Sequence, residues 1–145
     1  MRRIALVALA LVAAQPLAGC EAKAGFTVAD AQFQPPLVGN GVGVGYFAIR
    51  SMKADRIVKV SSPAAQAVEI HEMMMTGQQM SMQRRMSVDL PAGKTIEFKP
   101  GGLHLMVFSP AAVEPGAAIP ITIELQSGLK QTIAFPRSKF GNQPN

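Results

Sequence analysis

The sequence has no tryptophan, one tyrosine, one cysteine and two histidines in 145 residues. A blue-copper electron-transfer site requires a cysteine thiolate, and the only cysteine, Cys20, directly follows an apolar leader, so that class is disfavoured. The 14 Lys and Arg are scattered without interleaved aromatic residues, which argues against a nucleic-acid partner. No Ser-His-Asp set, phosphate loop or paired-carboxylate pattern stands out. We therefore expect a binding protein, not an enzyme, and assign no catalytic residue.

The N-terminal segment has the pattern of an export signal. Arg2 and Arg3 precede the apolar run IALVALALVAA, which is followed by QPLAGC. This run is too short to span a bilayer. The ending LAGC resembles the lipobox of bacterial lipoproteins, in which the cysteine becomes the lipidated first residue. We expect residues 1–19 to be a signal peptide, Cys20 to carry a lipid anchor in a membrane, and the protein to be periplasmic; ordinary cleavage nearby, leaving a free thiol, is the alternative.

The rest of the chain alternates apolar and polar residues in short segments separated by Gly and Pro, a pattern typical of β-strands. In TIEFK, for example, Ile96 and Phe98 face one way and their polar neighbours face the other. Many short strands without helical periodicity predict an all-β fold, an antiparallel β-sandwich or barrel. We expect a tether at residues 20–25, one β domain at 26–136 and a flexible tail at 137–145. The strands are expected at residues 26–33, 42–50, 56–62, 67–73, 80–86, 95–99, 103–109, 121–125 and 130–135.

Methionine is concentrated in one segment, which holds six of the nine: Met73, Met74, Met75, Met80, Met82 and Met86. Such a cluster alone is typical of a flexible core filler or an adaptable binding surface. The two histidines change this interpretation. His71 opens the segment, and in the strand LHLMVFS the side chains of His104 and Met106 share one face while Leu105 takes the other. The sequence therefore predicts imidazole and thioether groups together on the face away from the core.

The spacing His71-x10-Met82-x21-His104-x-Met106 resembles the ligand motif of the periplasmic copper chaperones that serve the copper A site of cytochrome c oxidase. The flanking words VEIHEM and LPAGKTIEFKPGGLHLM are similar as well. The resemblance implies a cupredoxin-like β fold, these four residues as copper ligands, and a copper-accepting partner such as an oxidase subunit or an assembly factor. One departure is that many members place arginine directly after the motif methionine, whereas here Gln83 precedes Arg84 and Arg85.

The donor types independently favour Cu(I). Thioethers are soft, neutral ligands suited to Cu(I), whereas Zn²⁺ prefers thiolate, imidazole or carboxylate and Cu(II) prefers a tetragonal set of N and O ligands. Neutral thioethers can also be exchanged one at a time without proton uptake. The expected function is thus a Cu(I) metallochaperone that transfers its metal by ligand exchange. Candidates for an auxiliary role around the site are Glu69, Glu72, Met73, Met80 and Met86.

Three other functions remain open from the sequence. A copper-sequestering tolerance protein would need the same site. A zinc-dependent hydrolase could use His71 and His104 with Glu69 or Glu72, because catalytic zinc sites commonly have three N or O ligands and a water, but the motif methionines would then be idle. A structural lipoprotein could present the methionines as an interaction patch without any metal.

Overall fold

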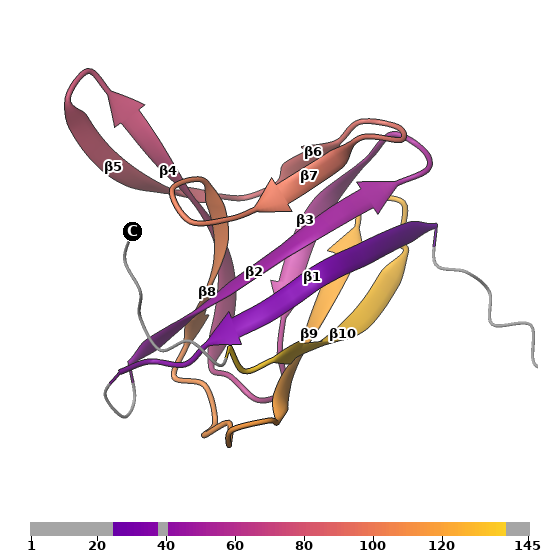
Figure 1. Cartoon of the computed structure of the whole chain (residues 1–145). Coiled ribbons are helices and arrows are strands. Elements are labelled where there is room, and N and C mark those ends of the chain that lie inside the picture. The colour runs from indigo at the N-terminus through magenta and orange to yellow at the C-terminus, as the bar shows by residue number, and fades with distance from the viewer. Residues whose placement is uncertain (1–24, 38–40, 139–145) are drawn as a thin grey trace, which may run out of the picture.

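Ten strands and no helix form the part of the chain that the structure describes, residues 25–37 and 41–138, in a computed structural model (Figure 1). The expected signal peptide, Cys20 and most of the expected tether and tail lie outside the described residues. Within the described ranges there is no helix of the length and hydropathy needed to cross a membrane. The prediction of an all-β fold is confirmed. The strands are β1 (Phe26–Gln34), β2 (Val42–Ser51), β3 (Asp55–Ser61), β4 (Ala67–Thr76), β5 (Gln79–Arg85), β6 (Val88–Leu90), β7 (Thr95–Phe98), β8 (Leu103–Phe108), β9 (Ala118–Leu125) and β10 (Lys130–Pro136).

Two sheets make up the fold. One has the order β1-β2-β7-β8-β4-β5 and the other has the order β10-β9-β3-β6. The strands pair antiparallel as expected, except that β7 and β8 are parallel neighbours through the pair Phe98 and Leu103. At one edge of the larger sheet, the β4–β5 hairpin extends beyond the rest of the molecule (Figure 1). This projection is where the methionine-rich segment lies.

The core lies between the sheets and is built from the alternating residues that the sequence predicts to face inward. Phe98 is 2% exposed, and Ile121 and Ile123 are fully buried. The ring of Phe47 stacks on Phe98 with centroids 4.1 Å apart and contacts Phe135 edge-on at 5.6 Å. Aromatic pairs in such geometries contribute about 0.5–1.5 kcal/mol beyond their buried area. This packing supports the larger sheet on the side opposite to its outer face.

Some local features differ from the sequence expectation. Strand β6 was not expected, because three residues are too few to show alternation. Between β3 and β4, residues 63–66 form turns and bends. Strand β9 begins before Pro120, since this proline lies beyond the last β3 partner and its missing N–H breaks no pairing with β3. Arg137, assigned to the tail, donates a hydrogen bond from its backbone N–H to Ala117 O at 2.9 Å.

Glycine at position 43 is required by close packing in the first two strands. A Cβ added there would lie 2.5 Å from a ring carbon of the fully buried Phe33 and 2.9 Å from the carbonyl oxygen of Gln34. We expect Gly43→Ala to lower the free energy of unfolding by about 1–3 kcal/mol, the usual cost of overpacking, as measured by urea denaturation. Gly102→Ala is the matched control, because its Cβ would meet nothing closer than 3.7 Å. Equal stabilities of the two variants would contradict the packing argument.

Candidate metal centre

The outer face of β5, β4 and β8 carries all four predicted copper ligands. His71 on β4 pairs directly with His104 on β8, and Met106 pairs with Glu69. On the other side of β4, Met82 of β5 pairs with Met73. Opposed residues project to the same face of a sheet, with Cβ atoms about 4.5–5.5 Å apart, and diagonal neighbours lie about 7–8 Å apart. His71 is therefore the centre of the group: His104 lies opposite it, and Met82 and Met106 lie on its two diagonals.

The orientation of these side chains follows from burial of their neighbours. Ile70 and Leu105 are 4% and 0% exposed and face the core. Strand alternation then turns His71, His104 and Met106 outward, as the sequence predicts. His104 is nevertheless only 8% exposed, and within the described residues it shares the class of buried polar side chains with Ser51 alone. A buried imidazole requires partners for its ring nitrogens.

The turn before β8 supplies one of these partners. Gly101 has φ of +77°, a conformation that favours glycine, and it leads to Gly102, whose carbonyl oxygen points back toward the sheet. That oxygen accepts a hydrogen bond from His104 Nδ1 at 3.0 Å and another from the backbone N–H of Met73 at 3.1 Å. Since a carbonyl only accepts, Nδ1 carries the proton and Nε2 of His104 keeps its lone pair. The same carbonyl thus orients His104 and fixes the point where β4 leaves β8.

His71 has the opposite arrangement of ring nitrogens. Its Nε2 lies 2.9 Å from Oε2 of Glu69, and Oε1 of Glu69 pairs with Nη1 of Arg84 at 3.2 Å. A carboxylate accepts the Nε2 proton, so the lone pair of neutral His71 lies on Nδ1. This Nδ1 is buried and has no hydrogen-bond partner. A buried nitrogen with a free lone pair is costly unless something binds to it, so Nδ1 of His71 is available as a donor to a metal ion.

The two imidazoles lie at a separation compatible with one shared metal ion. Their ring centroids are 6.1 Å apart and their planes are inclined by 38°. A metal–nitrogen bond of about 2.0 Å, with about 1.2 Å from nitrogen to ring centre, allows two imidazoles to share an ion at centroid separations up to about 6.4 Å. Half-buried Met106 is the next side chain after His104 on the same face of β8. The His71–His104–Met106 group therefore fits a copper ion as cargo.

Met82 lies farther from the centre of the group than the other three predicted ligands do. Its side chain is 49% exposed, and it lies on the diagonal of His71 away from Met106. The β5 residue directly opposite His71 is Arg84. Diagonal pairs remain within reach of long side chains, so Met82 can approach an ion held by His71, but the strand pairing alone does not bring it beside Met106.

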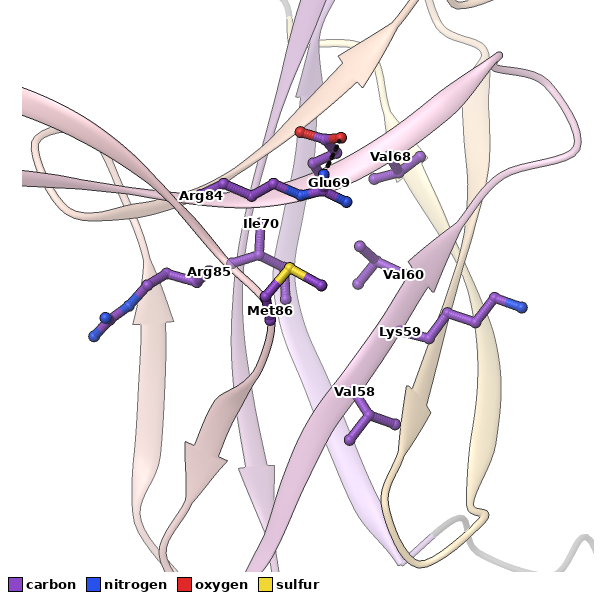
Figure 2. Close-up of a pocket in the computed structure, with 9 residues that line it drawn as sticks. All are labelled: Val58, Lys59, Val60, Val68, Glu69, Ile70, Arg84, Arg85 and Met86. Atoms are coloured by element: carbon purple, nitrogen blue, oxygen red, sulfur yellow. Dashed lines mark ion pairs between the residues drawn. The ribbon is translucent and has the colours of Figure 1, made fainter.

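The auxiliary residues divide into two groups. Glu69 is bonded to His71 as expected, and Met73 and Met80 lie on the same face as the histidines. Glu72 lies on the opposite face and pairs with Arg85 Nε at 2.8 Å, so its expected role beside His71 is corrected. Met86 is also removed from the site, because it follows the end of β5 and lines a shallow groove of about 120 Å³ with residues of β3 and β4 (Figure 2).

Two contributions to the site were missed from the sequence. Arg84 holds the second oxygen of Glu69, and Figure 2 shows the two side chains facing each other. The sequence does show an arginine two positions after Met82, not directly after it, but it does not show that Glu69 is the partner of this arginine. The contribution of the Gly102 carbonyl has no sequence signal, since every residue carries a carbonyl.

The zinc alternative needs three N or O ligands. Residues 25–37 and 41–138 contain no group of three His, Cys, Asp or Glu side chains placed to hold a metal.

Comparison with known proteins gives a family and a fold. Residues 26–137 match the model of the family described as "Putative lipoprotein LpqE-like". The chain is 31% identical over 86 residues to "Putative lipoprotein Lxx21020" of Leifsonia xyli subsp. xyli (strain CTCB07), covering 58% of this chain and 52% of that protein. The chain thus spans about half the length of this curated relative.

Solved structures share the fold at low sequence identity. A copper-bound PCuAC domain from PmoF2 superposes with a TM-score of 0.65 at 20% identity, covering 79% of this chain and 92% of that domain. The solution structure of Cu(I)-bound DR1885 from Deinococcus radiodurans has a TM-score of 0.53 at 19% identity, covering 77% of this chain and 78% of that protein. The predicted cupredoxin-like sandwich is confirmed by this likeness.

Proposed function

Because this chain belongs to the LpqE-like lipoprotein family and has the fold of PCuAC domains, we propose that it is an exported Cu(I) carrier rather than an enzyme. The observation that carries the proposal is that Nδ1 of His71 is buried and has no hydrogen-bond partner. The ring centre of His71 lies 6.1 Å from that of His104, and Met106 is the next residue after His104 on the same face of β8. His71, Met82, His104 and Met106 are the proposed ligands. Two imidazoles with two thioethers favour Cu(I) over Zn²⁺ or Cu(II).

Delivery by ligand exchange is supported by the graded exposure of the proposed ligands. His104 is buried, His71 and Met106 are half-buried, and Met82 is 49% exposed on a projecting hairpin. An acceptor can therefore replace Met82 first, and no proton has to be taken up when a thioether leaves. We propose that the acceptor is the copper A site of cytochrome c oxidase or one of its assembly factors, reached in the periplasm from a lipid anchor at Cys20.

The direct test is an anaerobic titration of the purified protein with Cu(I), Cu(II) and Zn²⁺ against a competing chelator. The expected result is that the first equivalent of Cu(I) is retained while Cu(II) and Zn²⁺ are removed. Retention of Zn²⁺ in preference to Cu(I) would overturn the proposal.

Delivery and sequestration are separated in cells. A deletion strain grown under copper limitation should lose oxidase activity and regain it when copper is added. Normal oxidase activity together with increased copper sensitivity would instead indicate sequestration.

Glu69 is expected to position His71 through the Nε2 hydrogen bond. We expect Glu69→Ala to weaken Cu(I) binding about 10- to 100-fold, since partners that orient a ligating histidine have effects of this size. Glu72→Ala is the matched control, because Glu72 lies on the same strand but faces the other way. Chelator competition measures the affinity, and long-range ¹⁵N–¹H NMR should show a changed proton distribution on the His71 ring only in Glu69→Ala. Equal effects of the two variants would exclude a positioning role.

A further inference from the structure

The outer face of the β4–β5 hairpin carries a second set of thioethers. Pairing between β4 and β8 ends at Glu72 and Leu103, and beyond it the hairpin continues as a two-stranded ribbon (Figure 1). In this ribbon Met73 pairs with Met82 and Met75 pairs with Met80. The four side chains therefore form two adjacent rows on the face that also carries His71.

Three of these methionines, Met75, Met80 and Met82, are exposed, and Met73 is half-buried. Met75 and Met80 are 69% and 58% exposed, and every residue of β5 is exposed. Residues 73–83 contain no charged side chain, so the ribbon offers an ion no carboxylate. Opposed Cβ atoms about 4.5–5.5 Å apart, with diagonals of about 7–8 Å, place three or four flexible thioethers within reach of one small ion. Such a donor set suits a soft monovalent cation and is poor for Zn²⁺, Mg²⁺ or Ca²⁺.

We infer that Met73, Met75 and Met80 form a second, thioether-only Cu(I) site on the hairpin, which shares Met82 with the histidine site. Met82 lies between the two sets, opposite Met73 and diagonal to His71. Copper held by the ribbon can pass to His71 and His104 by replacing one neutral ligand after another, with Met82 bound throughout. No electron or proton is transferred in this exchange. The inference rests on the proposed function and adds a loading step to it.

The test follows each methionine separately. The protein is labelled with ¹³C at the methionine methyl groups and titrated anaerobically with Cu(I). The first equivalent should shift the methyl signals of Met82 and Met106, and the second should shift those of Met73, Met75 and Met80. Methyl signals of Met75 and Met80 that stay in place at excess Cu(I) would overturn the inference and leave the hairpin as a copper-free interaction surface.

Substitutions separate the two sites. The double variant Met75→Leu/Met80→Leu should lose the second equivalent while its affinity for the first stays within about threefold. Met74→Leu is the matched control, because Met74 lies on the opposite face of the ribbon and pairs with Ser81. The variant His71→Ala should lose tight retention of the first equivalent but keep copper-induced shifts of Met75 and Met80. If the methyl signals of Met75 and Met80 no longer shift with copper in His71→Ala, no independent hairpin site exists. In that case, normal retention of the first Cu(I) equivalent by Met75→Leu/Met80→Leu would still support the histidine site.

Discussion

Replacing Met82 and Met106 together by Leu is expected to weaken retention of the first Cu(I) equivalent by more than about a hundredfold, or more than about 2.7 kcal/mol. Leu has no donor atom, so the ion would keep only the two imidazoles of His71 and His104. Of the two single variants, Met106→Leu should weaken Cu(I) retention more than Met82→Leu, because Met106 is half-buried next to His104 whereas Met82 is 49% exposed. Competition with a chromogenic Cu(I) chelator under anaerobic conditions measures both.

The control for this experiment is Met52→Leu, an equally conservative change at a side chain that is 69% exposed in another part of the fold. Exchanges between Leu and Met usually cost less than about 1.5 kcal/mol of stability, so all variants should fold. Zn²⁺ binding should be the same in the double variant and the parent, since Zn²⁺ makes little use of thioethers. Unchanged Cu(I) retention in the double variant would mean that the thioethers are not ligands and would favour a site of nitrogen and oxygen donors.

The strands could be predicted because most of them bury one face. Ile121 and Ile123 alternate with polar residues, and the alternation reports directly on which side faces the core. The same signal is absent from β6, which is only three residues long, and it cannot say which strands are neighbours. The parallel pairing of β7 with β8 depends on a tight turn at Lys99–Gly102 and on contacts between distant segments. The order of the strands in the sheets therefore could not be predicted from the alternation pattern within each strand.

The sequence predicts the residues of the candidate site, but it predicts less of their geometry. Alternation around Leu105 places His104 and Met106 on the outer face without knowledge of the fold. The direct opposition of His71 and His104 depends on the register between β4 and β8, and the opposition of Met82 and Met73 depends on the hairpin turn at Gly77. Spacing in the sequence suggested one compact group of four, whereas the register puts Met82 and Met106 on opposite sides of His71.

The second large effect is expected in the core directly beneath the site. Leu105 is fully buried and lies between His104 and Met106 in the sequence. It packs against Gly45, because a Cβ added at Gly45 would lie 3.2 Å from the Cβ of Leu105. We expect Leu105→Ala to lower the free energy of unfolding by about 2–5 kcal/mol, since it removes buried methyl groups and leaves a cavity. A domain with about 5–15 kcal/mol of stability would lose a large part of it. Urea denaturation of the metal-free protein measures the loss.

The same variant tests whether the core holds the ligands in place. Burial of Leu105 keeps its strand in the register that turns His104 and Met106 outward, so Leu105→Ala should both destabilise the protein and weaken Cu(I) binding. Copper should then stabilise the variant less than the parent, because ligand binding raises stability by RT ln(1 + [L]/Kd). Leu37→Ala, at a side chain that is 78% exposed, should change the unfolding free energy by less than about 0.5 kcal/mol. A destabilised Leu105→Ala protein with parental Cu(I) affinity would mean that the outer face organises its ligands independently of the core, through the Gly102 carbonyl and Glu69 alone.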